Sequence, residues 1–546
     1  MLSYRKLAMR VLGRPLHTGG IDSPRPASQR AAAFVLTAAM LITLAAPAFA
    51  GTWYIENGDI TVKAGETKGT NKVSQGANQE VEDTNTIITN ENKDTASSNT
   101  VTIETNDKND TVEVTLKDVN IDASSRNNAA VSVTGEGDTN IKLDGDNALK
   151  SDIYSSGISS SGSLTISGGE NDSLTAQGGS GADGIYSSGS LTISGGTVTA
   201  NGGSSGGGDG GDGIWSSGGV TISGGSTVTA NGGDGKDDYG GDGIRSDSGD
   251  VTISGGSTVT ANGGNGGNVS GDGIRSGGGD VTISGGTVKA AGGDSKDGYG
   301  GDGIRSGGVT ISGGTVNAAG GNGGKVGGYG ICSFARVAIS GGTVEAAGGN
   351  GSTGGGSGIY SSVIDLSGSL ELTAKAGSPT GKALLQNGRE LDLDTIKDKL
   401  GPGAKVTATD ANGDSKQVSI PRPVESEKPV IPEESSSSSD GGSSAPSASV
   451  SSLPGLTVTD KDGQRISYTS TQSGNTLTVC VGRFTASFRI SLAALRQLRA
   501  EGIETIAFQT VLCSTTLSVD ELLAMGGENA EAVLTHRFTD SSLTVG

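Results

Sequence analysis

The segment Gly241–Gly264, GDGIRSDSGDVTISGGSTVTANGG, is one copy of a unit that decides the fold. Its parts GDGI, VTISGG and TVTA return, with small changes, between Gly157 and Gly377. The isoleucine of GDGI recurs at spacings of 27, 29, 30, 30, 30, 27 and 28 residues, as Ile158, Ile185, Ile214, Ile244, Ile274, Ile304, Ile331 and Ile359. A repeat of this length is typical of a solenoid, in which each turn buries its apolar face only by stacking on its neighbours.

Apolar and polar residues alternate within each unit, as in Val251-Thr252-Ile253 and Thr258-Val259-Thr260. Alternation with period two indicates half-buried strands, and Gly-Gly and Ser-Gly pairs separate three such strands per unit. The 97 glycines alone would suit a disordered linker, but the in-phase Ile and Val positions argue against one. We therefore predict an all-β fold, a right-handed three-sided parallel β-helix.

Residues 1–50 have the features of an export signal. Six basic residues lie in this segment, an apolar run extends from Ala31 to Ala46, and Ala48-Phe49-Ala50 forms an A-x-A cleavage site before Gly51. The apolar run is too short for a comfortable membrane span. We expect the mature chain to be secreted or held on the outer cell surface, without membrane insertion.

The composition argues against several classes of function. The leader carries 6 of the 39 basic and 1 of the 59 acidic residues, which leaves 33 basic against 58 acidic residues and a formal charge of −25. Nucleic acid is therefore a poor partner. His17 and His536 are the two histidines, so zinc sites and histidine triads are not expected in the repeats. The mature chain keeps Cys332, Cys480 and Cys513, too few for a disulfide scaffold, and a Cys480–Cys513 pair stays open.

The composition also changes along the chain, and these changes suggest domain boundaries. A short helix is expected near residues 392–400, and Ser491 is a good N-cap for a later one. The predicted order is an amino-terminal cap with early coils (51–156), glycine-rich coils (157–377), a carboxy-terminal cap (378–420), a Pro/Ser-rich linker (421–453) and a small α+β domain (454–546).

Stacking turns each repeated position into a column with neighbours about 4.8 Å apart. The first notable column is the aspartate of GDGI in five consecutive coils, Asp183, Asp212, Asp242, Asp272 and Asp302. Adjacent carboxylates repel by roughly 0.9 kcal/mol even at the dielectric of water. We predict Ca²⁺ as the counter-charge; aspartates that accept hydrogen bonds within their own turns are the alternative. Gly178–Tyr186 and Gly207–Trp215 resemble the calcium nonapeptide of secreted toxins and proteases, though here once per coil rather than in tandem.

The second column follows the isoleucine and faces outward. It reads Ser159, Tyr186, Trp215, Arg245, Arg275, Arg305, Cys332 and Tyr360. Aromatic rings stack on sugar faces and guanidinium groups pair with carboxylates. We therefore predict carbohydrate binding by Tyr186, Trp215, Arg245, Arg275, Arg305 and Tyr360. The alternative is that the arginines only neutralise nearby aspartates.

Two further interpretations are less favoured. A stacked Thr-x-Thr array resembles the flat face of β-helical ice-binding proteins, but it breaks at Lys289, Asn317 and Glu345. Aspartates and arginines on a β-helix also resemble pectate lyases. A catalytic site is normally a single break in a repeat, and the break here, Cys332–Arg336, has no carboxylate column beside it in the sequence.

Three sequence features together resemble the bacterial carbohydrate-binding β-helix family first described in clostridia. These are WYIENGDITV at Trp53–Val62, the segment Val114–Ser151 and the LTISGG units. The resemblance covers about residues 51–377 and implies a secreted, non-catalytic β-helix that binds calcium and plant polysaccharide, including acidic ones. A passive surface or adhesin stalk that presents the terminal domain is the competing class.

Overall fold

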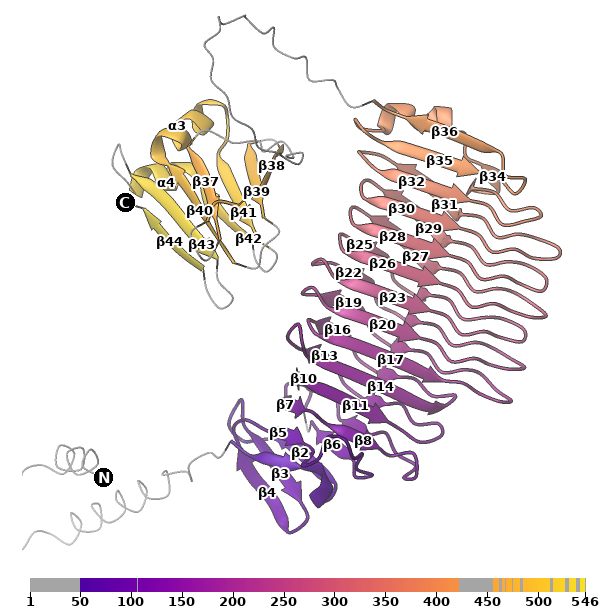
Figure 1. Ribbon diagram of the computed structural model, residues 1–546, viewed down its shortest axis with the longest axis vertical. Helices are drawn as coiled ribbons and strands as arrows, with labels where there is room; N and C mark the ends of the chain where they lie inside the picture. The colour runs from indigo at the N-terminus through magenta and orange to yellow at the C-terminus, as the bar shows by residue number, and fades with distance from the viewer. Residues whose placement is uncertain are drawn as a thin grey trace, which may run out of the picture. The chain divides into compact units, whose positions relative to one another are not determined.

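The computed structural model describes residues 50–105, 107–421 and, with short gaps, 455–545. Strands make up 50% of the described residues and helices 6%, and most strands belong to a parallel β-solenoid of about 13 turns. The predicted all-β class and parallel β-helix are confirmed (Figure 1). The predicted export signal and the linker lie, but for their end residues, outside the described residues, and so does Cys513.

Each glycine-rich coil contributes one strand to each of three faces. The first face holds β12 (Ile158–Ser160), β15 (Ile185–Ser187), β18 (Ile214–Ser216), β21 (Ile244–Ser246) and β24 (Ile274–Ser276). The second holds β13 (Leu164–Ser167), β16 (Leu191–Ser194), β19 (Val220–Ser223), β22 (Val251–Ile253) and β25 (Val281–Ile283). Single longer strands cover both faces in the last coils, namely β27 (Ile304–Ile311), β29 (Ile331–Ile339) and β31 (Ile359–Leu366).

The third face is a separate parallel sheet that ends in one antiparallel strand, β36 (Ser415–Ser419). Its parallel strands are β8 (Asn120–Asp122), β11 (Asp146–Lys150), β14 (Ser173–Ser180), β17 (Thr197–Gly203), β20 (Thr227–Asn231), β23 (Thr258–Asn262), β26 (Thr287–Ala291), β28 (Thr315–Ala319), β30 (Thr343–Ala347), β32 (Glu371–Lys375) and β35 (Lys405–Thr409). The outward Thr-x-Thr positions lie on this face, where Thr260 is followed in register by Lys289.

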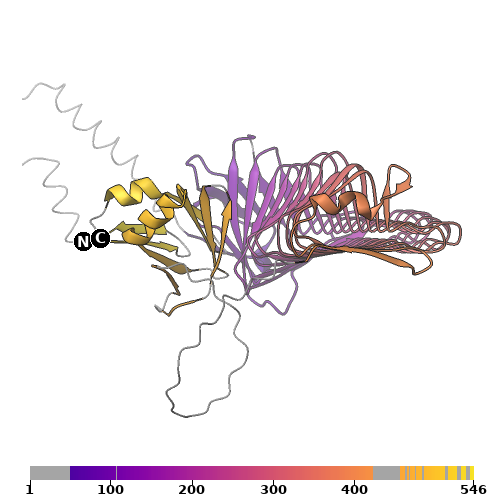
Figure 2. The ribbon, with the colours of Figure 1, turned by 90° about the horizontal axis from the view of Figure 1, so that it is seen from above.

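The core follows from the alternation in each strand. In the coil of β21, β22 and β23, the inward side chains Ile244, Val251, Ile253, Val259 and Ala261 are at most 1% exposed. Successive coils pair in register, so each inward residue lies over its equivalent one coil earlier. Figure 2 views the solenoid from above, where successive coils overlie one another. One continuous apolar core therefore runs through the solenoid.

The first described coils are less regular. β2 (Ile60–Ala64) pairs in parallel with β6 (Val101–Glu104) but antiparallel with β3 (Asn71–Gln75), which pairs antiparallel with β4 (Asn78–Asp83). The other strands of this part are β1 (Thr52–Tyr54), β5 (Ile87–Thr89), β7 (Thr111–Lys117), β9 (Val131–Thr134) and β10 (Asp138–Asp144), with the 3₁₀ turn η1 (Ile55–Asn57). The antiparallel strands interrupt the parallel ladder at this end of the solenoid.

The other end closes with β33 (Leu384–Gln386), β34 (Arg389–Glu390) and the 3₁₀ helix η2 (Leu393–Lys399). The Asp392 carboxylate accepts a hydrogen bond from the Asp394 N–H and caps η2. Ile396 of η2 is buried against the solenoid core. The short helix expected near residues 392–400 is therefore present, as a 3₁₀ helix.

The carboxy-terminal residues form their own core from two four-stranded sheets and two helices. The sheets hold β37 (Leu456–Thr459), β40 (Ala486–Ser491), β43 (Glu531–His536) and β44 (Ser541–Val545), and β38 (Thr469–Ser473), β39 (Thr476–Cys480), β41 (Thr505–Gln509) and β42 (Ser514–Ser518). α3 (Leu492–Ala500) begins after the predicted N-cap Ser491, and α4 is Val519–Met525. No helix among the described residues is long and apolar enough to cross a bilayer.

Candidate functional site

The outward column predicted to bind carbohydrate is continuous on the first face, and we call it the strip. The strand register pairs its members in the order Tyr186, Trp215, Arg245, Arg275, Arg305, Cys332 and Tyr360. Cys332 is buried, and the other six are half-buried. The structure therefore brings all six predicted residues into one line along the solenoid axis.

The amino-terminal part of the strip is packed against itself. Tyr186 meets Trp215 edge to face, with ring centroids 5.1 Å apart. The Arg245 guanidinium lies 5.0 Å from the centroid of Trp215. Asp247 accepts hydrogen bonds from Trp215 Nε1 at 3.0 Å and from Arg245 Nε at 2.8 Å. Because these partners hold the rings and the guanidinium in place, this part of the strip is rigid.

The carboxy-terminal part of the strip opens into a hollow of about 460 Å³, which we call the aromatic groove. Its ring and guanidinium side chains are Arg275, Tyr299, Arg305, Tyr329, Phe334 and Tyr360. Tyr329 and Tyr360 are stacked, with centroids 5.0 Å apart and planes 16° apart. The Arg305 guanidinium lies 5.4 Å from the ring centroid of Phe334, which is 59% exposed. The groove therefore offers both flat apolar rings and cations to solvent.

The five aspartates of GDGI form a second column, the aspartate column, which is buried. Each is between 5% and 9% exposed. Each Oδ1 accepts a hydrogen bond from the backbone N–H at the same position of the next coil, at 2.5 to 2.8 Å. The predicted alternative to calcium was that each aspartate accepts a hydrogen bond within its own turn. The aspartates do accept backbone hydrogen bonds, but from the next coil.

Burial raises the pKa of all five carboxyl groups. It is the largest cause for each, and it brings the pKa of Asp183 and of Asp302 to about 6. The pKa values of Asp212 and Asp272 are raised further by neighbouring carboxylates in the column. Hydrogen bonds from backbone N–H groups and nearby arginines act in the opposite direction.

The second carboxylate oxygen faces the arginines of the strip. Asp212 Oδ2 lies 3.7 Å from Arg245 Nη1. The corresponding distance is 3.8 Å between Asp242 and Arg275 and 3.6 Å between Asp302 and Arg305. These distances allow attraction without a short hydrogen bond. The predicted alternative, arginines that neutralise aspartates, is therefore compatible with the geometry, while 33% to 41% of each arginine side chain still faces solvent.

The aspartate column ends at Tyr329, which donates its N–H to Asp302 in place of a sixth aspartate. Cys332 pairs in register with Arg305, and its thiol lies against the Asp302 carboxyl. The expectation that no carboxylate column lies beside Cys332–Arg336 is therefore wrong. It failed because the neighbour lies one coil earlier, 30 positions away in the sequence. Burial raises the pKa of the Cys332 thiol.

The calcium prediction concerns the same aspartates. Among the described residues, no three or more His, Cys, Asp or Glu side chains gather as a metal site would require. The column instead places one carboxylate per coil, with an N–H on one oxygen. Calcium at Asp183, Asp212, Asp242, Asp272 and Asp302 stays a prediction, with the turn carbonyls as the additional ligands it would need.

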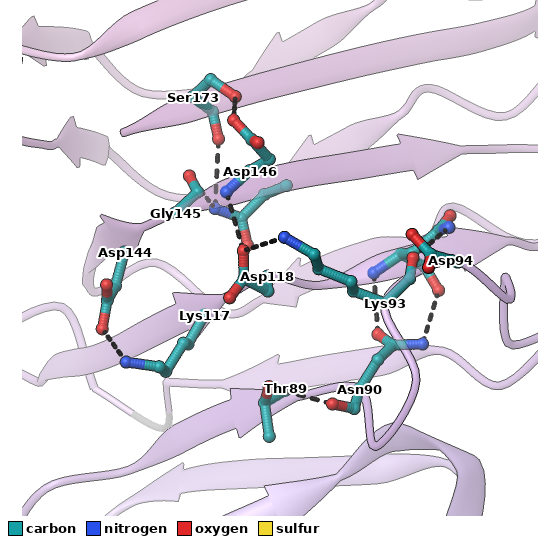
Figure 3. Close-up of polar contacts among 12 residues, drawn as sticks. Thr89, Asn90, Lys93, Asp94, Lys117, Asp118, Asp144, Gly145, Asp146 and Ser173 are labelled. Atoms are coloured by element: carbon teal, nitrogen blue, oxygen red, sulfur yellow. Dashed lines mark hydrogen bonds and ion pairs between the residues drawn. The ribbon is translucent and has the colours of Figure 1, made fainter. Parts of the chain in front are cut away.

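Carboxylates in the early coils have different surroundings (Figure 3). Lys117 Nζ lies 2.8 Å from Asp144 Oδ2 on the neighbouring strand, and both side chains are about half exposed. Asp118 accepts a hydrogen bond from the Asp146 N–H at 3.2 Å and lies 3.8 Å from Lys93 Nζ. These are surface ion pairs and turn contacts, not a buried column.

Three rings of the aromatic groove were not predicted from the sequence, namely Tyr299, Tyr329 and Phe334. Tyr329 could have been found, because GYGI replaces GDGI in that repeat. Tyr299 lies in a loop whose length changes from coil to coil, and Phe334 lies in the irregular Cys332–Arg336 segment. Tyr299 repeats Tyr239 two coils earlier rather than in every coil, and Phe334 has no equivalent in the other repeats.

Comparison with known proteins gives no independent indication of function. No family model, curated protein or solved structure matches this chain. The function is therefore argued from the geometry of the chain itself.

Proposed function

We propose that this chain is an exported, non-catalytic polysaccharide-binding protein whose contact surface is the aromatic groove and the strip that leads into it. One observation carries the proposal. Four aromatic rings and two arginines from successive coils converge on one open hollow of about 460 Å³. Exposed rings and cations in a shared concave site are typical of ligand contact rather than of a solvated surface.

The chemistry of these side chains suits sugars. A tyrosine or phenylalanine ring offers a flat apolar face with little conformational entropy to lose. Guanidinium groups donate paired hydrogen bonds to hydroxyl or carboxylate oxygens. The ladder between coils fixes the backbone under Arg305 and Tyr360. A rigid surface loses less entropy when it binds a ligand, and this favours affinity.

Two observations support a binding role without catalysis. The carboxyl groups at the groove, Asp272 and Asp302, each commit one oxygen to a backbone N–H and are buried. The repeats also contain no histidine. Groups that must move a proton need a reachable atom near the substrate. In each of these carboxyl groups the next coil holds one oxygen, and burial leaves little of the other exposed.

Retention on insoluble polysaccharides tests the proposal. The variant Arg305→Ala, Phe334→Ala removes one cation and one exposed ring from the groove, and we expect retention to weaken roughly tenfold or more. Arg336→Ala is the matched control, because Arg336 is exposed and pairs with Asp365 outside the groove. The strip is tested in parallel by the variant Trp215→Ala, Arg275→Ala. Equal retention of the wild type and the groove variant would contradict the assigned surface.

The competing function is a stalk that holds the terminal domain away from the cell. The solenoid of about 13 turns favours it, since coils about 4.8 Å apart extend to roughly 60 Å. Failure of both wild type and variants to bind any polysaccharide of a broad panel would favour the stalk over the binding protein.

A further inference from the structure

Four successive loops that follow the third face, between Asp234 and Gly328, repeat every second coil rather than every coil. Asp234–Gly241 reads DGKDDYGG, and Asp294–Gly301, 60 residues later, reads DSKDGYGG. The loops that follow each of them are shorter, with NGGNVSG at Asn265–Gly271 and NGGKVGG at Asn322–Gly328. Within these four loops, tyrosine therefore alternates with valine at the equivalent position.

The structure places these loops directly over one another (Figure 1). Isolated parallel bridges join Tyr239 to Val269, Val269 to Tyr299 and Tyr299 to Val326. The Tyr299 N–H donates to Asn268 O at 2.8 Å, and the Ser270 N–H donates to Tyr299 O at 3.0 Å. Since each coil adds about 4.8 Å, the backbones of the two tyrosines lie roughly 9.6 Å apart along the axis.

Two exposed tyrosines lie at this loop edge, with a less exposed valine between them. Tyr239 is 52% exposed and Tyr299 is 53% exposed, whereas Val269 between them is half-buried. A neighbouring hollow of about 440 Å³ is bounded by Lys236 and Lys296, with glycines of the short loop between them. Tyr299 also lines the aromatic groove, so the loop edge and the groove are continuous.

We propose that this loop edge binds a linear polysaccharide that lies along the solenoid axis, with every second sugar stacked on Tyr239 or Tyr299. The inference rests on the proposed function and adds the direction and repeat of the ligand. An extended chain with a twofold repeat presents the same ring face at every second sugar. The length of one disaccharide in such a chain is close to the two-coil spacing, whereas a coiled chain does not present its sugars in that way.

The spacing gives the ligand a minimum length. An oligosaccharide long enough to reach both tyrosines binds the second ring in an intramolecular step. It therefore gains affinity without a new kind of contact. Lys236 and Lys296 flank the same line and can donate to ring or hydroxyl oxygens. Affinity is therefore expected to rise sharply once an oligosaccharide spans both tyrosines.

Calorimetric titration of the full mature chain with β-1,4-linked gluco- and manno-oligosaccharides, from disaccharide to hexasaccharide, tests the inference. The coiled α-1,4-linked series is the comparison. We expect Tyr239→Ala and Tyr299→Ala each to weaken binding of the hexasaccharide roughly tenfold and the disaccharide much less. Tyr54→Ala, at an exposed tyrosine far from these loops in sequence, is the control.

A register variant separates spacing from ring count. The variant Tyr299→Val, Val326→Tyr keeps the number of rings but moves one ring by one coil. This places the moved ring roughly 14 Å from Tyr239 along the axis. Hexasaccharide affinity as low as in Tyr299→Ala supports the inference, and wild-type affinity overturns it. If both tyrosine variants bind the β-1,4-linked series as tightly as the wild type does, the inference is also overturned, while the proposed function stands. Absence of binding to any polysaccharide defeats the proposed function itself. Melting of each variant confirms that it is folded.

Discussion

The early coils and the glycine-rich coils both carry aspartates that contact the neighbouring coil, but the surroundings of these aspartates differ. In the early coils, Asp144 and Asp122 face lysines across neighbouring strands, with side chains 48% and 38% exposed. In the glycine-rich coils the aspartates are buried and accept backbone N–H groups. The pKa of Asp122 is lowered, chiefly by its hydrogen bond with Ser124, whereas burial raises the pKa of Asp272.

This contrast shows that burial, not residue type, decides what an aspartate contributes to stability. An exposed ion pair adds little to the free energy of unfolding, because water screens the charges and two long side chains are immobilised. A buried acceptor satisfies an N–H that otherwise stays unpaired, at the cost of a raised pKa. The early coils therefore gain little from each pair, while the glycine-rich coils depend on every carboxyl group.

The largest expected effect comes from removing one acceptor of the aspartate column. Asp272→Ala leaves the buried Asp302 N–H without its partner, so we expect the free energy of unfolding to fall by about 2 kcal/mol. Asp144→Ala is the matched control in the early coils. Urea unfolding followed by circular dichroism measures both. Equal losses in the two variants would remove the distinction between the regions.

The pH dependence should be opposite in the two regions. The unfolded chain titrates aspartates at about pH 4, while the folded chain holds protons on Asp183 and Asp302 up to a pKa of about 6. The stability from these groups is complete below about pH 4 and is lost as pH rises through about 6. Asp122 has the opposite effect, because its pKa is lowered in the folded chain. Its contribution to stability is present near neutral pH and is lost as the pH falls.

Melting between about pH 5 and about pH 8 measures this difference. We expect the melting temperature to fall toward the higher pH. Asp272→Asn keeps an acceptor oxygen without the charge, so this variant should gain stability near neutral pH and show a flatter profile. A wild-type profile that rises with pH, or an Asn variant with the same slope, would contradict the assignment to the column.

A smaller effect is expected at the exposed pairs. Lys117→Ala should lower the free energy of unfolding much less than Asp272→Ala does, because water screens the exposed pair, and added salt should reduce the difference between variant and wild type. Lys150→Ala, whose partner is Asp122 at 3.0 Å, should behave alike. A salt-insensitive loss of several kcal/mol would mean that these pairs are structurally coupled to the core.

The smallest expected effect concerns calcium. If the aspartate column holds a calcium ion with a dissociation constant near the free calcium concentration, chelation should cost roughly 0.4 kcal/mol. Melting with EGTA against added calcium measures it, and magnesium serves as the control cation. An unchanged melting temperature would leave the carboxyl groups as hydrogen-bond acceptors alone.

The sequence was sufficient for features that repeat in every coil. Ile244 and its equivalents predict the strand register, and the register places Arg275 and Arg305 outside. The burial of Asp272 was not predictable, because its flanking glycines carry no pattern that tells inside from outside. Phe334 and Tyr299 were also missed, because their positions depend on loop length and on contacts with a coil about 30 residues away.

The carboxyl-to-amide ladder also bears on how such a chain changes length. Each aspartate supplies the acceptor that the following coil needs, and each coil brings a donor for the one before it. A duplicated or deleted unit of 30 residues, the spacing of Ile244, Ile274 and Ile304, therefore leaves no unmatched group at the junction. Unequal recombination within the gene can lengthen or shorten the rod by whole coils, while the terminal closures stay untouched.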